Sequence, residues 1–165
     1  MKADKLYLVG FMGAGKSTIA AAVGRRIGWR AEDIDQRIET RERRSVAAIF
    51  AQEGEVYFRT VERDVLRELL PERNVVVAAG GGTFVEPDNR ALMLADGAVA
   101  WLDIPLNCVI ERIPRDGRRP LAADLPQLEQ LYLRRRAAYA DAHVRIDASR
   151  PAEEVVERLL EWIGY

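Results

Sequence analysis

The chain has 165 residues, of which 48% are hydrophobic and 31% charged, and its formal net charge is −1. This composition is typical of one globular domain with a sizeable core, and the near-zero charge argues against broad binding to nucleic acid or membrane surfaces. Cys108 is the single cysteine, which excludes an internal disulfide and fits a reducing, cytoplasmic location. Because the first apolar run is short and stops at a glycine-rich loop, we expect neither a secretory signal nor a membrane span.

Strand-like apolar runs alternate with helix-like segments along the chain. The apolar runs predict strands at residues 6–9, 75–79, 98–102 and 144–146, with a short, weak strand that ends at Asp33. Helical spacing predicts helices at residues 17–27, 34–41, 45–53, 55–70, 87–94, 107–113, 126–140 and 151–162. The central runs are continuously apolar, as strands buried on both faces are. This alternation predicts an α/β fold, with a parallel sheet covered by helices.

The first strand is followed by G-F-M-G-A-G-K-S at residues 10–17, the pattern of a phosphate-binding loop. Its glycines permit backbone angles that let N–H groups converge on phosphate oxygens. Lys16 adds a positive charge for the β- and γ-phosphates, Ser17 offers a hydroxyl to Mg²⁺, and the helix that begins near Lys16 directs its positive end at the same anion. The alternative is a glycine-rich turn with an incidental lysine. The loop predicts nucleoside triphosphate binding but no particular reaction.

Two carboxylates follow the weak second strand, in A-E-D-I-D. Because residues two apart in an extended segment face the same side, we expect Asp33 and Asp35 to point together toward the phosphate loop. One carboxylate could support the Mg²⁺ shell while the other accepts a hydroxyl proton. The alternative is a solvated acidic turn that caps the next helix.

Residues 54–62 read G-E-V-Y-F-R-T-V-E, and on a helix Glu55, Arg59 and Glu62 share one face. They form either a surface ion-pair ladder or a pair of carboxylates that orient Arg59 toward an anionic substrate. Gly80-Gly81-Gly82 ends a buried strand, where glycines either form a flexible turn or let a ligand approach the backbone.

Arginines gather in the last third of the chain. Residues 111–125 combine four of them with proline and glycine, which predicts an irregular, mobile segment. Residues 134–136 are three consecutive arginines on a predicted helix, so at most two can reach a site, and a solvated basic face is the alternative. His143 stands alone and is assigned a structural role. Without a Cys/His cluster we expect neither a zinc site nor a Ser-His or Cys-His nucleophile.

Taken in order, these motifs resemble the shikimate kinase family, and the resemblance spans residues 8 to about 156. Many families share the phosphate loop, whereas the ordered combination is specific. The matching segments are residues 10–18, D-I-D at 33–35, residues 54–62, G-G-G at 80–82, R-R-P-L at 118–121 and R-R-A-A-Y at 135–139. The resemblance implies a three-layer P-loop kinase fold of the nucleoside-monophosphate-kinase type, with a five-stranded parallel sheet. It also implies one kinase domain over residues 1–165, with a lid at about 111–125.

The resemblance further implies transfer of the ATP γ-phosphate to the 3-hydroxyl of shikimate, with Mg²⁺ present. The implied partners are shikimate and ATP, with no nucleic acid and no membrane, and the implied state is a monomer. The phosphates of ATP would be held by Gly13, Ala14, Gly15, Lys16, Ser17 and Thr18. Ser17 would bind Mg²⁺, and Asp33 would support the ion through water.

For the acceptor, the resemblance implies that Asp35 binds the hydroxyls of shikimate and is the candidate base. Arg59 and Arg135 would bind its carboxylate, with Gly81 and Gly82 lining the same pocket. Arg119 in the lid would act on the transferring phosphate. Adenine would be flanked by an arginine of the lid's first part, either Arg112 or Arg115, and by the turn at Arg150 and Pro151.

Several positions depart from the family pattern and leave alternatives open. Arg43 stands where glycine is common, so it needs a positive φ or a different turn. Ala137 and Ala138 replace a usual Pro-Leu, which leaves the register of Arg135 against Arg136 undecided. Two other functions remain possible from the sequence: a kinase for another small hydroxyacid, such as gluconate, and a nucleotide-dependent binding module without catalysis. The intact charged residues of the motifs argue against the binding module.

Overall fold

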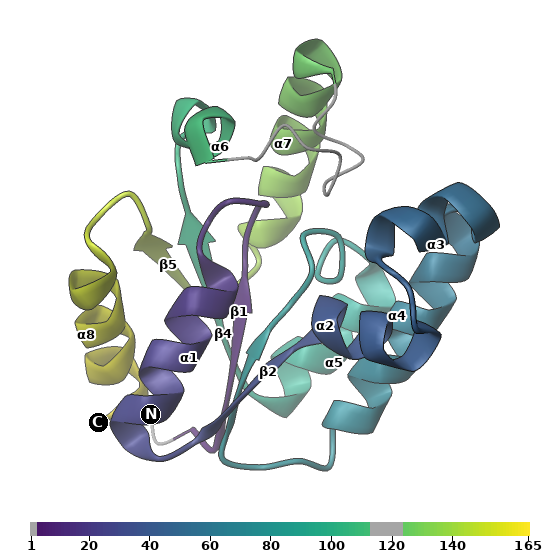
Figure 1. Ribbon diagram of the computed structural model, residues 1–165. Helices are drawn as coiled ribbons and strands as arrows, with labels where there is room; N and C mark the ends of the chain where they lie inside the picture. Colours follow the sequence, from purple (N-terminus) through teal and green to yellow (C-terminus); the bar gives the residue numbers. More distant parts are fainter. Residues whose placement is uncertain (1–2, 113–123) are drawn as a thin grey trace.

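The computed structural model describes residues 3–112 and 124–165 (Figure 1). Its strands are β1 (Lys5–Val9), β2 (Arg30–Asp33), β3 (Val75–Ala78), β4 (Ala98–Asp103) and β5 (Val144–Asp147). Its helices are α1 (Lys16–Ile27), α2 (Ile34–Glu42), α3 (Val46–Glu53), α4 (Glu55–Leu69), α5 (Pro87–Asp96), α6 (Leu106–Arg112), α7 (Leu125–Tyr139) and α8 (Ala152–Ile163). Every predicted element is present, with ends within two residues of those expected.

Within the described residues, five parallel strands form one sheet in the order β2-β3-β1-β4-β5. Leu6 of β1 pairs with Val76 of β3 on one side and with Ala98 of β4 on the other. All residues of these three strands are buried, which explains their continuously apolar sequences, whereas the edge strand β2 is partly exposed. Because the strands are parallel, their carboxyl ends meet at one edge of the sheet.

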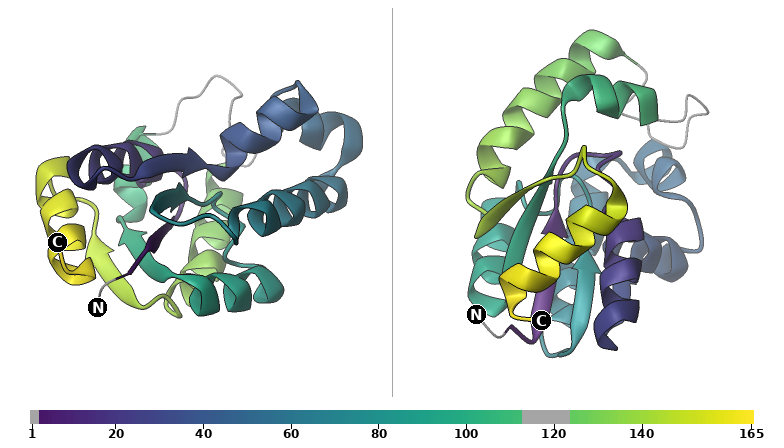
Figure 2. Two further views of the ribbon diagram at one scale, coloured as in Figure 1. Left: turned by 90° about the horizontal axis from the view of Figure 1, so that it is seen from below. Right: turned by 90° about the vertical axis from the view of Figure 1, so that its left-hand side faces the viewer.

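The helices cover both faces of the sheet. Helices α1 and α8 pack against each other on one face, and α5 and α7 lie on the opposite face (Figure 2). Helices α2, α3 and α4 contact one another beside the β2 edge (Figure 1). The three-layer α/β architecture predicted from the sequence is therefore confirmed. No helix in the described part of the chain is long and apolar enough to cross a membrane.

A buried lysine joins three elements at the amino edge of the sheet. Lys5 is fully buried, and its Nζ donates to the Leu69 carbonyl (2.7 Å), the Leu70 carbonyl (2.8 Å) and Asp96 Oδ2 (2.6 Å). The Tyr7 hydroxyl donates to the same Asp96 oxygen at 2.6 Å, and burial together with this bond raises the pKa of Tyr7. The lysine thus stabilises the C-terminal end of α4 and ties it to β1 and α5.

The turn between α2 and α3 adopts the conformation that a glycine would favour. Arg43 caps the C-terminus of α2 with φ = 53°, so of the two alternatives left by the sequence, a positive φ or a different turn, the structure has the positive φ. The next residue, Arg44, forms ion pairs with Glu42 (3.1 Å) and Glu53 (3.3 Å). These pairs hold the turn closed although its backbone conformation is unfavourable for arginine.

Candidate active site

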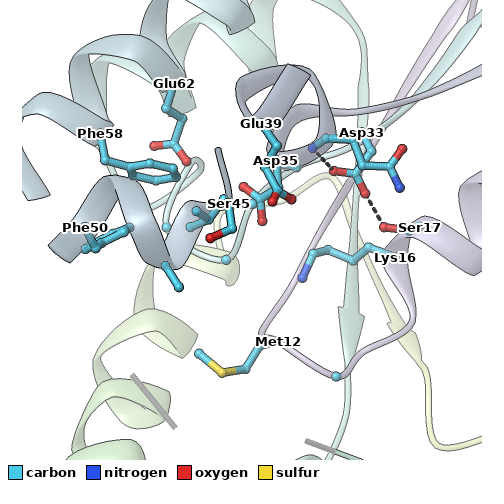
Figure 3. Close-up of a pocket in the computed structure, with 18 of the residues that line it drawn as sticks. Met12, Lys16, Ser17, Asp33, Asp35, Glu39, Ser45, Phe50, Phe58 and Glu62 are labelled. Carbon is cyan, nitrogen blue, oxygen red and sulfur yellow. Dashed lines mark hydrogen bonds between the residues drawn. The ribbon is translucent and has the colours of Figure 1, made fainter. Parts of the chain in front are cut away.

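A cleft of about 780 Å³ opens at the carboxyl edge of the sheet (Figure 3). Its walls come from the phosphate loop, the β2–α2 junction, α3, α4, the glycine turn after β3, and one arginine each from α6 and α7. The lining residues are Met12, Gly13 and 15–18; Asp33, Asp35, Gln36 and Glu39; 45–47 and Phe50; Phe58, Arg59 and Glu62; 79–82; Arg112; and Arg135. The structure therefore gathers most of the predicted site residues in one place.

The phosphate loop has the backbone that its glycines predict. The glycines at positions 10, 13 and 15 all have positive φ, and a Cβ on Gly10 would lie 2.5 Å from the carbonyl oxygen of Leu102. Helix α1 begins at Lys16, as expected, and within the described residues no side chain caps its N-terminus. Lys16 Nζ donates to the carbonyls of Gly10 (2.7 Å) and Phe11 (3.0 Å), which keeps the ammonium beside the loop. This geometry suits phosphate binding by backbone N–H groups and a lysine.

Of the two carboxylates, Asp33 ends β2 and only Asp35 lies on the following helix, so the extended segment given as the reason for their shared direction does not reach Asp35. Helix α2 begins at Ile34, and Asp33 is its N-cap, with Oδ1 accepting from the Gln36 backbone N–H at 3.0 Å. The other oxygen of Asp33 accepts a hydrogen bond from Ser17 Oγ (Figure 3). Asp35 lies in the first turn of α2 and also lines the cleft. The capping alternative is thus correct for Asp33, which nevertheless contacts the phosphate loop as well.

The Ser17–Asp33 pair fits a magnesium ion that is bound together with phosphate. Mg²⁺ usually takes one or two protein oxygens and completes its octahedron with water and substrate phosphates. One hydroxyl and one carboxylate beside a phosphate loop supply that kind of partial shell. The described residues contain no group of three or more His, Cys, Asp or Glu side chains that could hold a metal ion by themselves. The donor set therefore suits a metal that arrives with a nucleotide.

Arg59 is held by a buried carboxylate, as its helical spacing predicts. Its Nη1 lies 2.9 Å from Glu62 Oε1, and its Nη2 lies 3.5 Å from Glu55 Oε1. Glu62 is fully buried, whereas Glu55 is exposed, so the first contact is the stronger of the two. Burial by itself lowers the pKa of Arg59, but the charge and hydrogen bond of Glu62 outweigh it and raise that pKa. Arg59 is therefore a firmly charged group at the cleft wall.

Arg135 is a buried cation whose charge is incompletely compensated. Its side chain belongs to a residue that is only 6% exposed, and its guanidinium lies 5.7 Å from the ring centroid of Phe11. Across residues 3–112 and 124–165, no carboxylate forms an ion pair with it. Burial lowers its pKa and nearby Arg59 lowers it further, although Tyr139 and Glu62 partly oppose this shift. A buried cation of this kind favours binding of an anion.

The structure decides the register of the arginine run on α7. Arg135 lines the cleft, whereas Arg136 pairs with Asp103 and lies 4.9 Å from the ring centroid of Trp101. Arg134 is exposed. One of the three arginines therefore reaches the cleft, within the limit of two that the sequence set.

The glycine turn makes room for the site's own side chains. The φ values at residues 80–82 lie outside the left-handed range, so backbone conformation does not require glycine there. A Cβ on residue 80 would lie 2.8 Å from Asp35 Oδ1, and one on residue 81 would lie 2.7 Å from Arg135 Nη1. A Cβ on residue 82 would lie 2.6 Å from Arg59 Cζ. Close approach was expected for a ligand, but the structure shows it for these three side chains.

Comparison with known proteins identifies the family to which this geometry belongs. A family model described as shikimate kinase matches residues 12–164. The chain belongs to the shikimate kinase family. It is 41% identical to shikimate kinase from Salinibacter ruber, over 95% of this chain and 83% of that protein. It is 38% identical to the one from Persephonella marina, over 94% and 96% of the two chains.

A solved structure supports the same assignment. Shikimate kinase from Acinetobacter baumannii in complex with shikimate superposes with a TM-score of 0.93, at 34% identity, over 97% of this chain and 92% of that one. The predicted fold class, a P-loop kinase fold with a five-stranded parallel sheet, is confirmed.

Of the described residues predicted to flank adenine, Arg112 lines the cleft and Arg150 and Pro151 do not. Arg112 Nη1 donates to the Gly13 carbonyl at 3.2 Å, beside the phosphate loop. Arg150 pairs with Asp147 at 3.6 Å on the surface. Arg115, Arg119 and most of the expected lid lie outside the described residues. Ala14 of the phosphate loop is buried and does not line the cleft.

The cleft also contains residues that sequence reasoning missed. Glu39 lies one helical turn after Asp35, a spacing that could have been noticed because both carboxylates then share a face. Phe50 and Phe58 form an aromatic wall with ring centroids 4.7 Å apart (Figure 3). Their spacing is that of ordinary core residues, so the sequence carried no signal that they line a cleft.

Proposed function

We propose that this protein transfers the γ-phosphate of ATP to the 3-hydroxyl of shikimate and releases ADP and shikimate 3-phosphate. Family membership supports the reaction, and the cleft supports it chemically by joining a phosphate loop to two arginines. The observation that carries the proposal is the buried, incompletely compensated Arg135 beside Arg59. An acceptor with a carboxylate supplies the missing negative charge.

On the acceptor side, we assign the carboxylate of shikimate to Arg59 and Arg135. A charge-assisted hydrogen bond of this type contributes on the order of 1.5–3 kcal/mol, so two arginines would make the carboxylate the main anchor. The backbone at Gly81 and Gly82 lies against these two guanidinium groups and completes this end of the pocket. Asp35, whose carboxylate lies against Gly80 of the same turn, would bind the hydroxyls of the ring.

On the donor side, residues 13–18 would hold the phosphates through backbone N–H groups and Lys16. Ser17 would ligate Mg²⁺, with Asp33 supporting it. The ion, when bound, neutralises phosphate charge and orients the γ-phosphoryl group. Arg112 lies close enough to the loop to act on the nucleotide.

For the chemical step, Asp35 would accept the proton of the 3-hydroxyl of shikimate. The hydroxyl oxygen would bond to the γ-phosphorus of ATP, while the bond between that phosphorus and the β-phosphate oxygen breaks and ADP leaves. Lys16 and the N–H groups of the loop would stabilise the charge that spreads over the transferring phosphoryl group. Arg119, in the lid at about residues 111–125, is proposed to add a further positive charge and to help exclude water.

The remaining assignments concern adenine and the state of the protein. Arg112 or Arg115 and the turn at Arg150 and Pro151 remain proposed neighbours of adenine. We also propose that residues 1–165 act as one kinase domain, as a monomer in the cytoplasm, with no nucleic-acid or membrane partner. The near-zero net charge and the single cysteine support this setting.

The test is ADP release with Mg²⁺-ATP and a panel of acceptors: shikimate, quinate, gluconate and nucleoside monophosphates. We expect turnover that depends on shikimate and is much weaker with the other acceptors. Turnover with gluconate in place of shikimate would assign another hydroxyacid kinase. Tight ATP binding without transfer to any acceptor would assign a binding module. Either result would overturn the proposal.

A further inference from the structure

The buried carboxylate of Glu62 divides its two oxygens between two partners. Oε1 accepts from Arg59 Nη1 at 2.9 Å, and Oε2 accepts from the hydroxyl of Thr83 at 2.8 Å. Glu62 and Thr83 are both 0% exposed, so water does not compete for these bonds. Thr83 comes from the glycine turn and Glu62 from α4, so the contact joins two walls of the cleft.

The hydroxyl limits how Glu62 can bind Arg59. A guanidinium has five N–H donors, and a carboxylate that uses both oxygens takes two of them in a fork. Because Thr83 occupies Oε2, Glu62 binds Arg59 through one oxygen and leaves other N–H donors for the cleft. Without the hydroxyl, Oε2 would be a buried, charged oxygen in need of a donor, and the nearest cation is Arg59.

The backbone fixes Thr83 in the position that this role requires. Its N–H donates to the Gly80 carbonyl at 3.1 Å, and the Val85 N–H donates to the Gly82 carbonyl at 3.1 Å. A Cβ on Gly80 would lie 3.0 Å from Thr83 Oγ1 and 3.1 Å from Glu62 Oε2, so glycine leaves space for this bond. One turn therefore makes room for Arg59 and also orients the carboxylate that holds it.

We propose that Thr83 is a positioning residue for acceptor binding, which keeps Glu62 bound to Arg59 through one oxygen and so presents the remaining Arg59 donors to the acceptor's carboxylate. This inference rests on the proposed function, in which Arg59 binds that carboxylate. Thr83 itself touches neither substrate in this scheme and acts through Glu62.

The test compares Thr83→Val, which removes the hydroxyl at constant shape, with Thr83→Ser, which keeps it. Thr60→Val is the matched control, because the Thr60 hydroxyl donates to the Val56 carbonyl (3.1 Å) on the exposed side of α4. We expect Thr83→Val to raise the KM for shikimate about tenfold, the effect of one lost hydrogen bond to a charged group. The KM for ATP and kcat should stay within about twofold, and Thr83→Ser and Thr60→Val should resemble the wild type.

A second measurement separates positioning from folding. In a Glu62→Gln background, Thr83→Val should add less than about twofold to the KM for shikimate, because the two residues act through one contact. If Thr83→Val does not fold, Thr83→Ala serves as the hydroxyl-free variant, with calorimetric shikimate binding as the readout.

This proposal would be overturned, with the proposed function left standing, by an active, folded Thr83→Val enzyme with unchanged KM for shikimate or by a Thr83→Ser enzyme as impaired as Thr83→Val. An equal rise in the KM for ATP would overturn it too, since the effect would then be general. A wild type without shikimate turnover would overturn the proposed function, and this inference with it.

Discussion

The two edges of the sheet each bury a cation, but they treat its charge differently. At the amino edge, Lys5 is fully buried and its ammonium has three acceptors, one of them the carboxylate of Asp96. At the carboxyl edge, Arg135 is 6% exposed and lies beside a second cation, Arg59, and in the described part of the chain no carboxylate pairs with it. Both sites desolvate a charge, yet of these two cations only Lys5 has a carboxylate partner among residues 3–112 and 124–165 that neutralises it.

This difference separates a structural charge from a binding charge. Burying a charge is costly unless it is paired and hydrogen-bonded. Where the protein supplies the partner, as at Lys5, removal should damage the fold. Where a ligand must supply it, as at Arg135, removal should damage binding and spare the fold.

The largest expected effect is at the amino edge. Lys5→Met removes the 2.6 Å ion pair with Asp96, which is 12% exposed and keeps a longer contact to Arg73 (3.3 Å), and breaking one partner of a buried pair costs about 3–5 kcal/mol of unfolding free energy. Denaturant unfolding measures this, and the KM for shikimate should be unchanged in the protein that remains folded. Arg26→Met, whose pairs with Glu153 and Glu157 are exposed, is the control and should change stability little. A loss below about 1 kcal/mol for Lys5→Met would remove the contrast between the edges.

Next in size is a comparison of neighbouring arginines on α7. Arg135→Met should weaken shikimate binding by about 2–3 kcal/mol, while the unfolding free energy of the unliganded protein stays equal or rises. Arg136→Met should lower the unfolding free energy and leave shikimate binding unchanged. The reason is that Arg136 pairs with Asp103 and stacks on Trp101 away from the cleft. Calorimetric titration and denaturant unfolding test both variants. Similar profiles for the two would contradict the assigned register.

A smaller effect is expected when a methyl group is added at each edge. In Gly82→Ala the new Cβ meets the guanidinium of Arg59, a movable side chain, so the KM for shikimate should rise about tenfold with little loss of stability. In Gly97→Ala the new Cβ lies 3.0 Å from the backbone oxygen of Lys5, which cannot move away, so stability should fall by about 1–2 kcal/mol. Measuring the KM for shikimate and the thermal unfolding of both variants distinguishes these outcomes. A loss of stability in Gly82→Ala with none in Gly97→Ala would contradict this prediction.

The smallest effect is expected at Arg43, which lies away from both Lys5 and Arg135 and serves as a reference. Arg43 has φ = 53°, so Arg43→Gly should stabilise the protein by about 1 kcal/mol through relief of the left-handed strain. The KM values for both substrates should not change, since the residue does not line the cleft. A destabilised Arg43→Gly protein would mean that the arginine side chain contributes more than its backbone costs.

The sequence predicted the fold in more detail than it predicted the arrangement of the site. Continuous apolar runs located the strands, the glycine loop located the phosphate site, and the spacing of Glu62 from Arg59 located their shared helical face. The direction of Asp35 rested on an extended segment that is in fact helical, because the boundary between β2 and α2 falls between Asp33 and Ile34. The predicted elements, a strand that ends at Asp33 and a helix over residues 34–41, already placed this boundary correctly, and the extended geometry assumed for Asp35 conflicted with them.

Tertiary packing accounts for what remained open. Choosing Arg135 over Arg136 requires the rotation of α7 about its axis relative to the sheet, and three adjacent arginines carry no information about it. The purpose of residues 80–82 depends on which side chains lie against them, and these come from distant parts of the chain. The Phe50–Phe58 wall likewise becomes part of a cleft only through the arrangement of α3 and α4.

The central claim is that the buried guanidinium of Arg135 binds the carboxylate of the acceptor. Calorimetric titration of shikimate and its uncharged carboxamide into the wild type and Arg135→Met tests this most directly, as a double cycle. We predict that losing the carboxylate charge weakens binding to the wild type about a hundredfold but weakens binding to Arg135→Met by much less. Equal losses in the two proteins would contradict the account, because Arg135 would then not be the partner of that charge.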